Sequence, residues 1–111
     1  MATPTVPTEL ETAFKIIGDK WTGIILYTLK NGARRFSEIS HCACGINPRT
    51  LSQRLDTMEE NKLLTKQVFA ELPPRTEYTL TQKGLDLCQA LRPMMRWADN
   101  YYPGTVSPDC D

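Results

Sequence analysis

The stretch "GINPRTLSQRLDTMEENKLL", residues 45–64, decides the fold. Asn47 and Pro48 are typical of a helix start, because an asparagine side chain caps free backbone N–H groups and proline is tolerated at the first helical position. Three apolar residues then recur at i, i+4 and i+7: Leu51, Leu55 and Met58. This spacing predicts an amphipathic helix over 48–61, with a polar face opposite the apolar stripe.

A shorter apolar pattern precedes this helix. Phe36, Ile39 and Ala43 recur at helical spacing and predict a helix over 36–43. Gly45 predicts the turn that joins this helix to the next one. A short helix, a glycine-containing turn and a longer helix together are typical of a helix-turn-helix.

Two further helices are predicted nearer the N-terminus, over 8–17 and 20–30. The first is expected to begin at Thr8, which fits a capping box with Glu11 three residues later. The second follows Asp19, which is a suitable N-cap. Both segments carry apolar residues at helical spacing.

The pattern changes after the longer helix. Two short runs of β-forming residues flank a pair of prolines, which predicts a β-hairpin over 65–80. A last helix is predicted over 82–102, with Thr81 as its N-cap. Pro93 should kink or break this helix, because its ring clashes with the preceding turn.

The order of these elements predicts a winged helix-turn-helix, a mainly α fold with a small β-hairpin wing. The length of 111 residues suits one domain. We expect that domain to span 8–103, with flexible tails at 1–7 and 104–111.

Composition and charge set further bounds. Lys and Arg number 13 and Asp and Glu also number 13, so the net charge argues neither for nor against a nucleic-acid partner. The segment 30–54, however, holds five cationic side chains against Glu38 alone, a local charge of +4 that fits either DNA binding or a solvated face. No secretory signal or membrane-length apolar run is visible, so we expect a cytoplasmic protein without a membrane partner, whose four cysteines are reduced thiols.

Four stretches in this order resemble the HxlR family of bacterial winged-helix transcriptional regulators: "IIGDKWTGIIL", "GARRFSEI", "INPRTLSQRLDTMEENKLL" and "LPPRTEYTLTQKG". The likeness covers about residues 8–102. It implies a homodimer, joined through its terminal helices, that binds double-stranded DNA at a roughly palindromic operator near a promoter. Repression is the expected sense of regulation.

The sequence departs from the family at one position. Many members carry a cysteine just before the first helix, and some use it to sense oxidants or electrophiles. The matching position here is Thr8, so the resemblance does not carry that mechanism over. Cys42 and Cys44 instead lie where members usually have small, apolar or proline residues.

The polar face of the helix at 48–61 holds the candidate base-reading residues. The N-terminal part of a recognition helix enters the major groove, where Arg reads guanine and Gln reads adenine. The candidates are Asn47, Arg49, Thr50, Ser52, Gln53 and Arg54. Arg54 lies beside the apolar stripe, so it could clamp a phosphate or pair with an acidic neighbour. Asp56 and Glu60 would repel phosphates, so only the first two turns are expected to enter the groove.

Phosphate contacts are predicted from the segments that flank the recognition helix. The candidates are Arg34, Arg35, Ser37, Lys66 and Arg75. The first three open the helix at 36–43, and the last two belong to the wing. For Arg75, at the wing tip, a solvated loop charge remains the alternative.

Apolar and aromatic side chains near both ends of the domain are expected to form the dimer. These residues are Leu10, Phe14, Met95, Trp97, Tyr101 and Tyr102. A chain of this length gains much of its stability by association. Internal packing, or lining an effector pocket between subunits, stays open for the three aromatic residues that follow Pro93.

Three interpretations of Cys42 and Cys44 stay open. Together with His41 they offer only three closely spaced metal ligands, whereas a structural zinc site needs four, so neither a metal nor another cofactor is predicted. Nearby arginines could make a thiol reactive, and oxidation could then disturb the recognition helix as a redox switch. The remaining interpretation is that these thiols have no role.

The sequence holds no catalytic motif, so we do not expect an enzyme. The alternative to a DNA-binding regulator is a winged helix used for protein contacts without specific DNA. The sequence does not identify the operator, the target genes or a small-molecule or oxidant effector, and it does not separate activation from repression.

Overall fold

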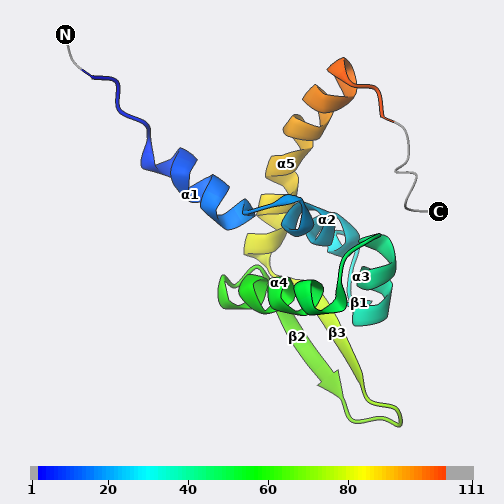
Figure 1. Ribbon diagram of the computed structural model, residues 1–111. Helices are drawn as coiled ribbons and strands as arrows, with labels where there is room; N and C mark the ends of the chain where they lie inside the picture. Colours follow the sequence, from blue (N-terminus) through cyan, green and yellow to red (C-terminus); the bar gives the residue numbers. More distant parts are fainter. Residues whose placement is uncertain (1–2, 105–111) are drawn as a thin grey trace.

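The structure is a computed structural model that describes residues 3–104. Along this part of the chain the elements are α1 (Thr8–Ile17), α2 (Lys20–Leu29), β1 (Arg34–Arg35), α3 (Phe36–Cys42), α4 (Pro48–Glu60), β2 (Leu64–Phe69), β3 (Arg75–Leu80) and α5 (Gln82–Tyr101). The predicted helix ranges differ from these by at most one residue at either end. The fold is the expected winged helix-turn-helix, in which α3 and α4 form the motif and the β2–β3 hairpin forms the wing (Figure 1).

One hydrophobic core joins the helix-turn-helix to the sheet. Its fully buried members come from α2, α3, α4 and the start of β2, and they include Ile25, Leu26, Leu29, Ile39, Leu51, Leu55, Met58 and Leu64. The predicted stripe of α4 is therefore confirmed, because all three of its residues are at most 1% exposed. Burying this stripe orients α4, so that its opposite face is presented to solvent.

The sheet has three antiparallel strands in the order β1-β3-β2. In the wing, Leu64 pairs with Leu80 and Phe69 pairs with Arg75 at the far end. The strand β1 was not predicted, because two residues show no periodicity that a pattern could detect. Its pairing of Arg34 with Tyr78 ties the segment before α3 to the wing.

The predicted capping box of α1 is wrong. Pro7 occupies the N-cap position and Thr8 is already the first helical residue, so the Thr8 side chain caps nothing. The backbone explains the shift, because Leu10 N–H donates to the carbonyl of Pro7 at 3.1 Å. Gly18, with a φ of 67°, ends the helix in a left-handed conformation that glycine adopts readily.

The last helix, α5, runs without a break through Pro93, which corrects the expectation of a break there. Pro93 removes one helical hydrogen bond to the carbonyl four residues earlier. Both Pro93 and Gln89 are exposed, so the freed carbonyl is accessible to solvent and the proline costs little here.

The start of α5 is attached to the turn between α4 and β2. Thr81 donates its backbone N–H to the Leu63 carbonyl at 3.0 Å and its hydroxyl to the Lys62 carbonyl at 2.6 Å. Lys83 Nζ donates to the Asn61 carbonyl at 2.7 Å. These bonds hold α5 against the end of the recognition helix.

Two elements project from this body. Figure 1 shows α1 and the distal half of α5 extending away from the helix-turn-helix. The radius of gyration of 16.1 Å reflects this shape, since a compact domain of this size has a value of about 13 Å. Within the described residues, no helix has the combined length and apolarity needed to cross a membrane.

Candidate nucleic-acid interface

The recognition helix α4 begins at the two residues predicted from the sequence, Asn47 and Pro48. Asn47 accepts a hydrogen bond from Arg49 N–H at 2.7 Å, and Pro48 occupies the first turn. With the apolar stripe buried, Arg49, Ser52 and Gln53 are exposed on the opposite face. These three side chains share one surface at the N-terminal half of the helix, where a major-groove reader makes its base contacts.

The second half of α4 carries the opposite charge. Asp56, Glu59 and Glu60 are all exposed, and no cation of α4 follows them. Thr57 Oγ1 donates to the Gln53 carbonyl at 3.0 Å, so this hydroxyl is engaged by its own helix. The helix therefore has a cationic, polar first half and an acidic second half.

Arg54 takes one of its two predicted roles in this structure. Its Nη2 lies 2.7 Å from Oδ2 of Asp19, the residue that also caps α2 by accepting from Trp21 N–H at 3.0 Å. The Arg54 side chain is only 25% exposed. The pair with an acidic neighbour is thus formed, and Arg54 connects α4 to the start of α2 rather than pointing away from the protein.

Arg75 is held by the wing itself. Its Nε donates to Glu77 Oε2 at 2.8 Å, its Nη1 contacts Glu71, and its guanidinium lies 4.1 Å from the centre of the Phe69 ring. The hydrogen bond to Glu77 raises the pKa of the Arg75 guanidinium, and Glu71 adds to the effect. Two carboxylates offset this cation, which makes Arg75 a weaker phosphate candidate than the exposed Lys66 on β2.

Sequence reasoning missed the carboxylate partners of Arg75. Glu71 lies four positions before it, and Glu77 two positions after it on the same face of β3. This spacing was the available signal, because side chains two apart on a strand point the same way. The contact across the wing tip, in contrast, depends on the geometry of the turn.

Two of the three candidates before and within α3, Arg35 and Ser37, lie beside the wing tip. Arg35 and Ser37 are exposed, whereas Arg34 is half-buried in β1. Arg35 N–H donates to Glu38 Oε1 at 2.9 Å and so helps to start α3. Arg35, Ser37 and Arg75 line one cavity of about 450 Å³ with the turn of the wing. The fold therefore brings together phosphate candidates that lie 40 residues apart in the sequence.

The predicted dimer residues form exposed apolar surface on the two projecting helices. Their exposed fractions run from 49% to 70% across Leu10, Phe14, Met95, Trp97, Tyr101 and Tyr102. Near the end of α5, the Trp97 ring centre lies 5.7 Å from that of Tyr101 and 5.9 Å from that of Tyr102. Helix α1 has no buried residue at all within this chain.

The cysteines next to the recognition helix lie where expected. Cys42 ends α3 and is exposed, and Cys44 lies in the turn with Sγ 3.2 Å from the His41 carbonyl oxygen. Cys44 is disulfide-bonded, so the expectation that all four cysteines are reduced thiols is wrong for Cys44. Between them, Ala43 is fully buried. Within residues 3–104 no group of three or more His, Cys, Asp or Glu side chains is placed to hold a metal ion. Cys110 lies outside the described residues.

Comparison with known proteins connects this geometry to a family. Residues 16–105 match the family model described as HxlR-like helix-turn-helix. The chain is 37% identical over 93 residues to the transcriptional regulator YodB of Bacillus subtilis, covering 84% of this chain and 83% of YodB.

Solved structures agree with that match. A transcriptional regulator of the MarR family from Enterococcus faecalis superposes with a TM-score of 0.78 at 34% identity, covering 93% of this chain and 94% of that one. Reduced YodB superposes with a TM-score of 0.75 at 35% identity, covering 91% of this chain and all of that one. Both matches extend over the helix-turn-helix, the wing and the projecting helices.

Proposed function

The chain belongs to the HxlR-like helix-turn-helix family and is a helix-turn-helix transcriptional regulator, and from that premise we propose that it binds a palindromic DNA operator as a homodimer. The observation that carries the proposal is the exposed, polar N-terminal half of α4, with Arg49, Ser52 and Gln53 opposite a buried stripe. Arg reads guanine and Gln reads adenine in the major groove. Repression in the cytoplasm, by occupying a promoter, is the proposed outcome.

Phosphate contacts frame this reading surface. Arg34, Arg35 and Ser37 lie at β1 and the start of α3, and Lys66 lies on the exposed side of the wing. Phosphate contacts fix the register of a protein on the duplex, whereas base contacts select the sequence. The acidic second half of α4 limits how far the helix enters the groove.

The projecting helices support the dimer. Exposed apolar residues such as Phe14, at 60%, and Trp97, at 58%, have no covering element among the described residues. A second copy that buries them would place two α4 helices on one face of the DNA. Half-sites about 34–36 Å apart, one helical turn of DNA, are the geometry that such a dimer requires.

Fluorescence anisotropy with the DNA upstream of the chain's own gene tests the proposal. Arg49→Ala should lose about 1–3 kcal/mol of binding free energy and relax the preference for one base pair. Arg34→Ala should weaken binding to all sequences evenly and flatten the dependence on salt concentration. Arg96→Ala, an exposed arginine on α5, is the matched control and should change neither.

Two outcomes would overturn the proposal. Salt-independent or absent binding to upstream DNA, with the fold intact, would favour the alternative of a winged helix used for protein contacts. A monomer in sedimentation at micromolar concentration would remove the dimer. For the dimer, Phe14→Ser is compared with Val68→Ser, because Val68 on the wing is 62% exposed and so gives a matched loss of apolar surface.

A second candidate function is redox control of DNA binding through the turn between α3 and α4. Cys42 and Cys44 flank the buried Ala43 directly before Asn47, so a covalent change there would move the start of the recognition helix. YodB has been solved both in a reduced form and after diamide treatment. Operator affinity is compared in diamide and in dithiothreitol, for the wild type and for Cys42→Ser and Cys44→Ser. An unchanged affinity, or an equal effect of Cys88→Ser, would exclude the switch.

A further inference from the structure

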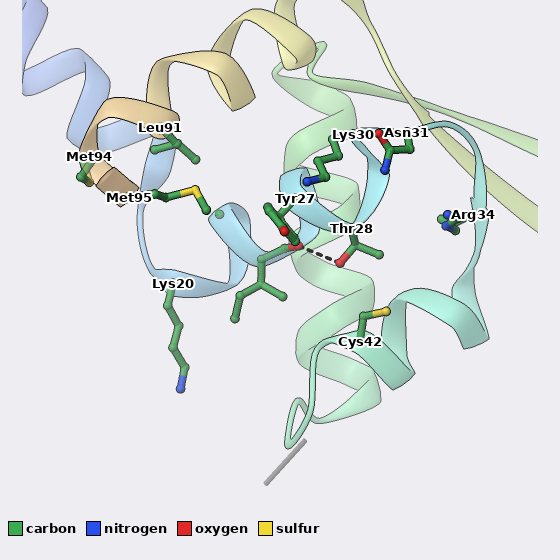
Figure 2. Close-up of a pocket in the computed structure, with 12 residues that line it drawn as sticks. Lys20, Tyr27, Thr28, Lys30, Asn31, Arg34, Cys42, Leu91, Met94 and Met95 are labelled. Atoms are coloured by element: carbon green, nitrogen blue, oxygen red, sulfur yellow. Dashed lines mark hydrogen bonds between the residues drawn. The ribbon is translucent and has the colours of Figure 1, made fainter. Parts of the chain in front are cut away.

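A cavity of about 810 Å³ opens between α2, α3 and α5. No residue of the DNA-reading surface on α4 lines it. Pockets of roughly 300–1,000 Å³ are the usual size for small-molecule ligands. Figure 2 shows α2 running through the middle of the site, with α5 on one side and the end of α3 on the other. Helix α5, which is distant from α2 and α3 in the sequence, therefore shares one recess with them.

The wall of this cavity is largely apolar. Helix α2 contributes Ile24 and Tyr27, and α5 contributes Leu91, Met94 and Met95. Met95 points toward Tyr27 in Figure 2. Tyr27, Met94 and Met95 are each about half exposed, at 52%, 53% and 49%. Methionine side chains adapt to flat ligands and make favourable contacts with aromatic rings.

The charged groups of the cavity all have one sign. Lys20, Lys30 and Arg34 line it, and no Asp or Glu of the described residues does so. None of these three cations takes part in an ion pair within residues 3–104, whereas Arg54 and Arg75 both do. Lys30 Nζ instead lies 3.8 Å from the centre of the Tyr27 ring. The cavity thus combines an apolar wall with uncompensated positive charge.

We propose that this cavity binds a small organic anion with a flat apolar body, such as an aromatic carboxylate. The ring system would pack between Tyr27 and the methionines of α5, and the carboxylate would lie near Lys30, with Lys20 and Arg34 adding positive charge from other parts of the wall. The uncompensated positive charge of the cavity would attract an anion, whereas a neutral ligand would gain nothing from it. The proposal concerns binding only, so it does not depend on the proposed operator.

The position of the site would connect such a ligand to both functional surfaces. Cys42 lines the cavity at the end of α3, five residues before the cap of α4. Met95 belongs both to this wall and to the proposed dimer surface. A ligand held here would contact the elements that position the recognition helix and the elements that join two copies.

Isothermal titration calorimetry with 2-naphthoate tests the site directly. The comparison ligands are 2-naphthol, which is neutral near pH 7, and 2-naphthylmethylamine, which is cationic. We expect saturable binding of 2-naphthoate, at least tenfold weaker binding of the amine, and an affinity that falls as salt is added. Equal affinity for all three ligands, or no saturable binding of 2-naphthoate, would overturn the proposal.

Variants locate the binding on the protein. Lys30→Gln should weaken 2-naphthoate binding roughly threefold, as for the loss of one exposed charge contact, and Lys20→Gln with Lys30→Gln should weaken it further. Lys15→Gln, on α1 outside the cavity, is the matched control. Gly23→Leu should abolish binding, because a side chain at position 23 projects toward Leu91 and fills the recess.

Circular dichroism melting of each variant separates loss of the site from loss of the fold. A Gly23→Leu protein that melts like the wild type and still binds 2-naphthoate would place the ligand elsewhere and overturn the assignment. The assignment would also be overturned if Lys15→Gln weakened 2-naphthoate binding as much as Lys30→Gln does. If Gly23→Leu fails to fold, the lysine variants and the ligand series decide the question.

Discussion

Arg54 on α4 and Asp19 at the start of α2 form an ion pair with Nη2 and Oδ2 2.7 Å apart, across 35 positions of sequence. Asp19 also accepts the N–H of Trp21 at 3.0 Å. One carboxylate therefore both caps a helix of the core and holds the recognition helix against it. This contact adds a polar link between α4 and α2 to the buried apolar stripe that orients α4.

The two roles of Asp19 are separable by substitution. Asp19→Asn keeps an oxygen for the cap but removes the ion pair, and should cost about 0.2–1 kcal/mol of unfolding free energy, since both side chains are partly exposed and screened by water. Asp19→Ala removes both and should cost about 1 kcal/mol more. Urea unfolding measures both values. Equal losses for the two variants would show that the cap contributes nothing.

Gly84 allows α5 to approach the backbone that follows α4. A Cβ at this position would lie 2.0 Å from the Leu63 carbonyl oxygen, which is a clash with rigid backbone. Gly84→Ala should therefore lower stability by about 1–3 kcal/mol, as overpacking does. Gly23→Ala is the control, because its Cβ would meet only Leu91 Cδ1 at 3.9 Å. Gly23→Ala should leave the unfolding free energy unchanged or raise it by about 0.5–1 kcal/mol. A lower unfolding free energy for Gly23→Ala would contradict this view of the packing.

Thr22 holds a buried hydroxyl that lacks a hydrogen-bond partner among the described residues. The residue is 1% exposed on α2. Such an unsatisfied group costs about 1–3 kcal/mol, so Thr22→Val, which keeps the shape, should raise the unfolding free energy. Thermal melting of the variant checks this. Thr28→Val is the contrasting change, because Thr28 Oγ1 donates to the Ile24 carbonyl at 2.8 Å, and it should not raise stability.

Tyr78 makes stability depend on pH in the alkaline range. Burial raises the pKa of the Tyr78 hydroxyl above 10.0, and the charges of Asp56 and Glu59 add to the shift. The unfolded tyrosine ionises first, so the stability linked to Tyr78 is complete below pH 10 and is lost as the pH rises through the raised value. Between pH 9 and pH 11, the unfolding free energy should fall less steeply with rising pH for Tyr78→Phe than for the wild type.

We expect Asp56 to limit the affinity of α4 for DNA. It is exposed one turn after Ser52, on the side of the helix that faces the proposed groove. Asp56→Asn removes one repulsive charge and should tighten binding to all sequences at low salt, with a steeper salt dependence. Glu9→Gln, on α1, is the charge-matched control. Tighter binding to one sequence only would point to a base contact instead.

Much of the fold follows from local patterns. The cap at Asn47, Pro48 in the first turn and the stripe of Leu51, Leu55 and Met58 predicted α4, and the structure has each of them. Thr8 was misjudged, because Pro7 took the N-cap position one residue earlier. Pro93 was expected to kink or break the last helix, and the break is wrong, because periodicity alone does not show that the carbonyl it frees lies on an exposed side.

The candidate site divides in a similar way. The exposure of Arg49, Ser52 and Gln53 follows from the period of one helix. The sequence could not choose between the two roles of Arg54, because Asp19 lies 35 positions away. The partners of Arg75 depend likewise on how the wing turns.

The sequence by itself determined the helix-turn-helix, its wing and the residues that face outward from α4. These features rest on interactions within a few residues, namely caps, turns and the spacing of apolar side chains. Tertiary structure alone decided which arginines are paired, how α5 meets Leu63 at Gly84, and that the cations at α2 and β1 line one cavity with the apolar side chains of α5. Those features join side chains from separate elements, and only the packing of the helices brings them together.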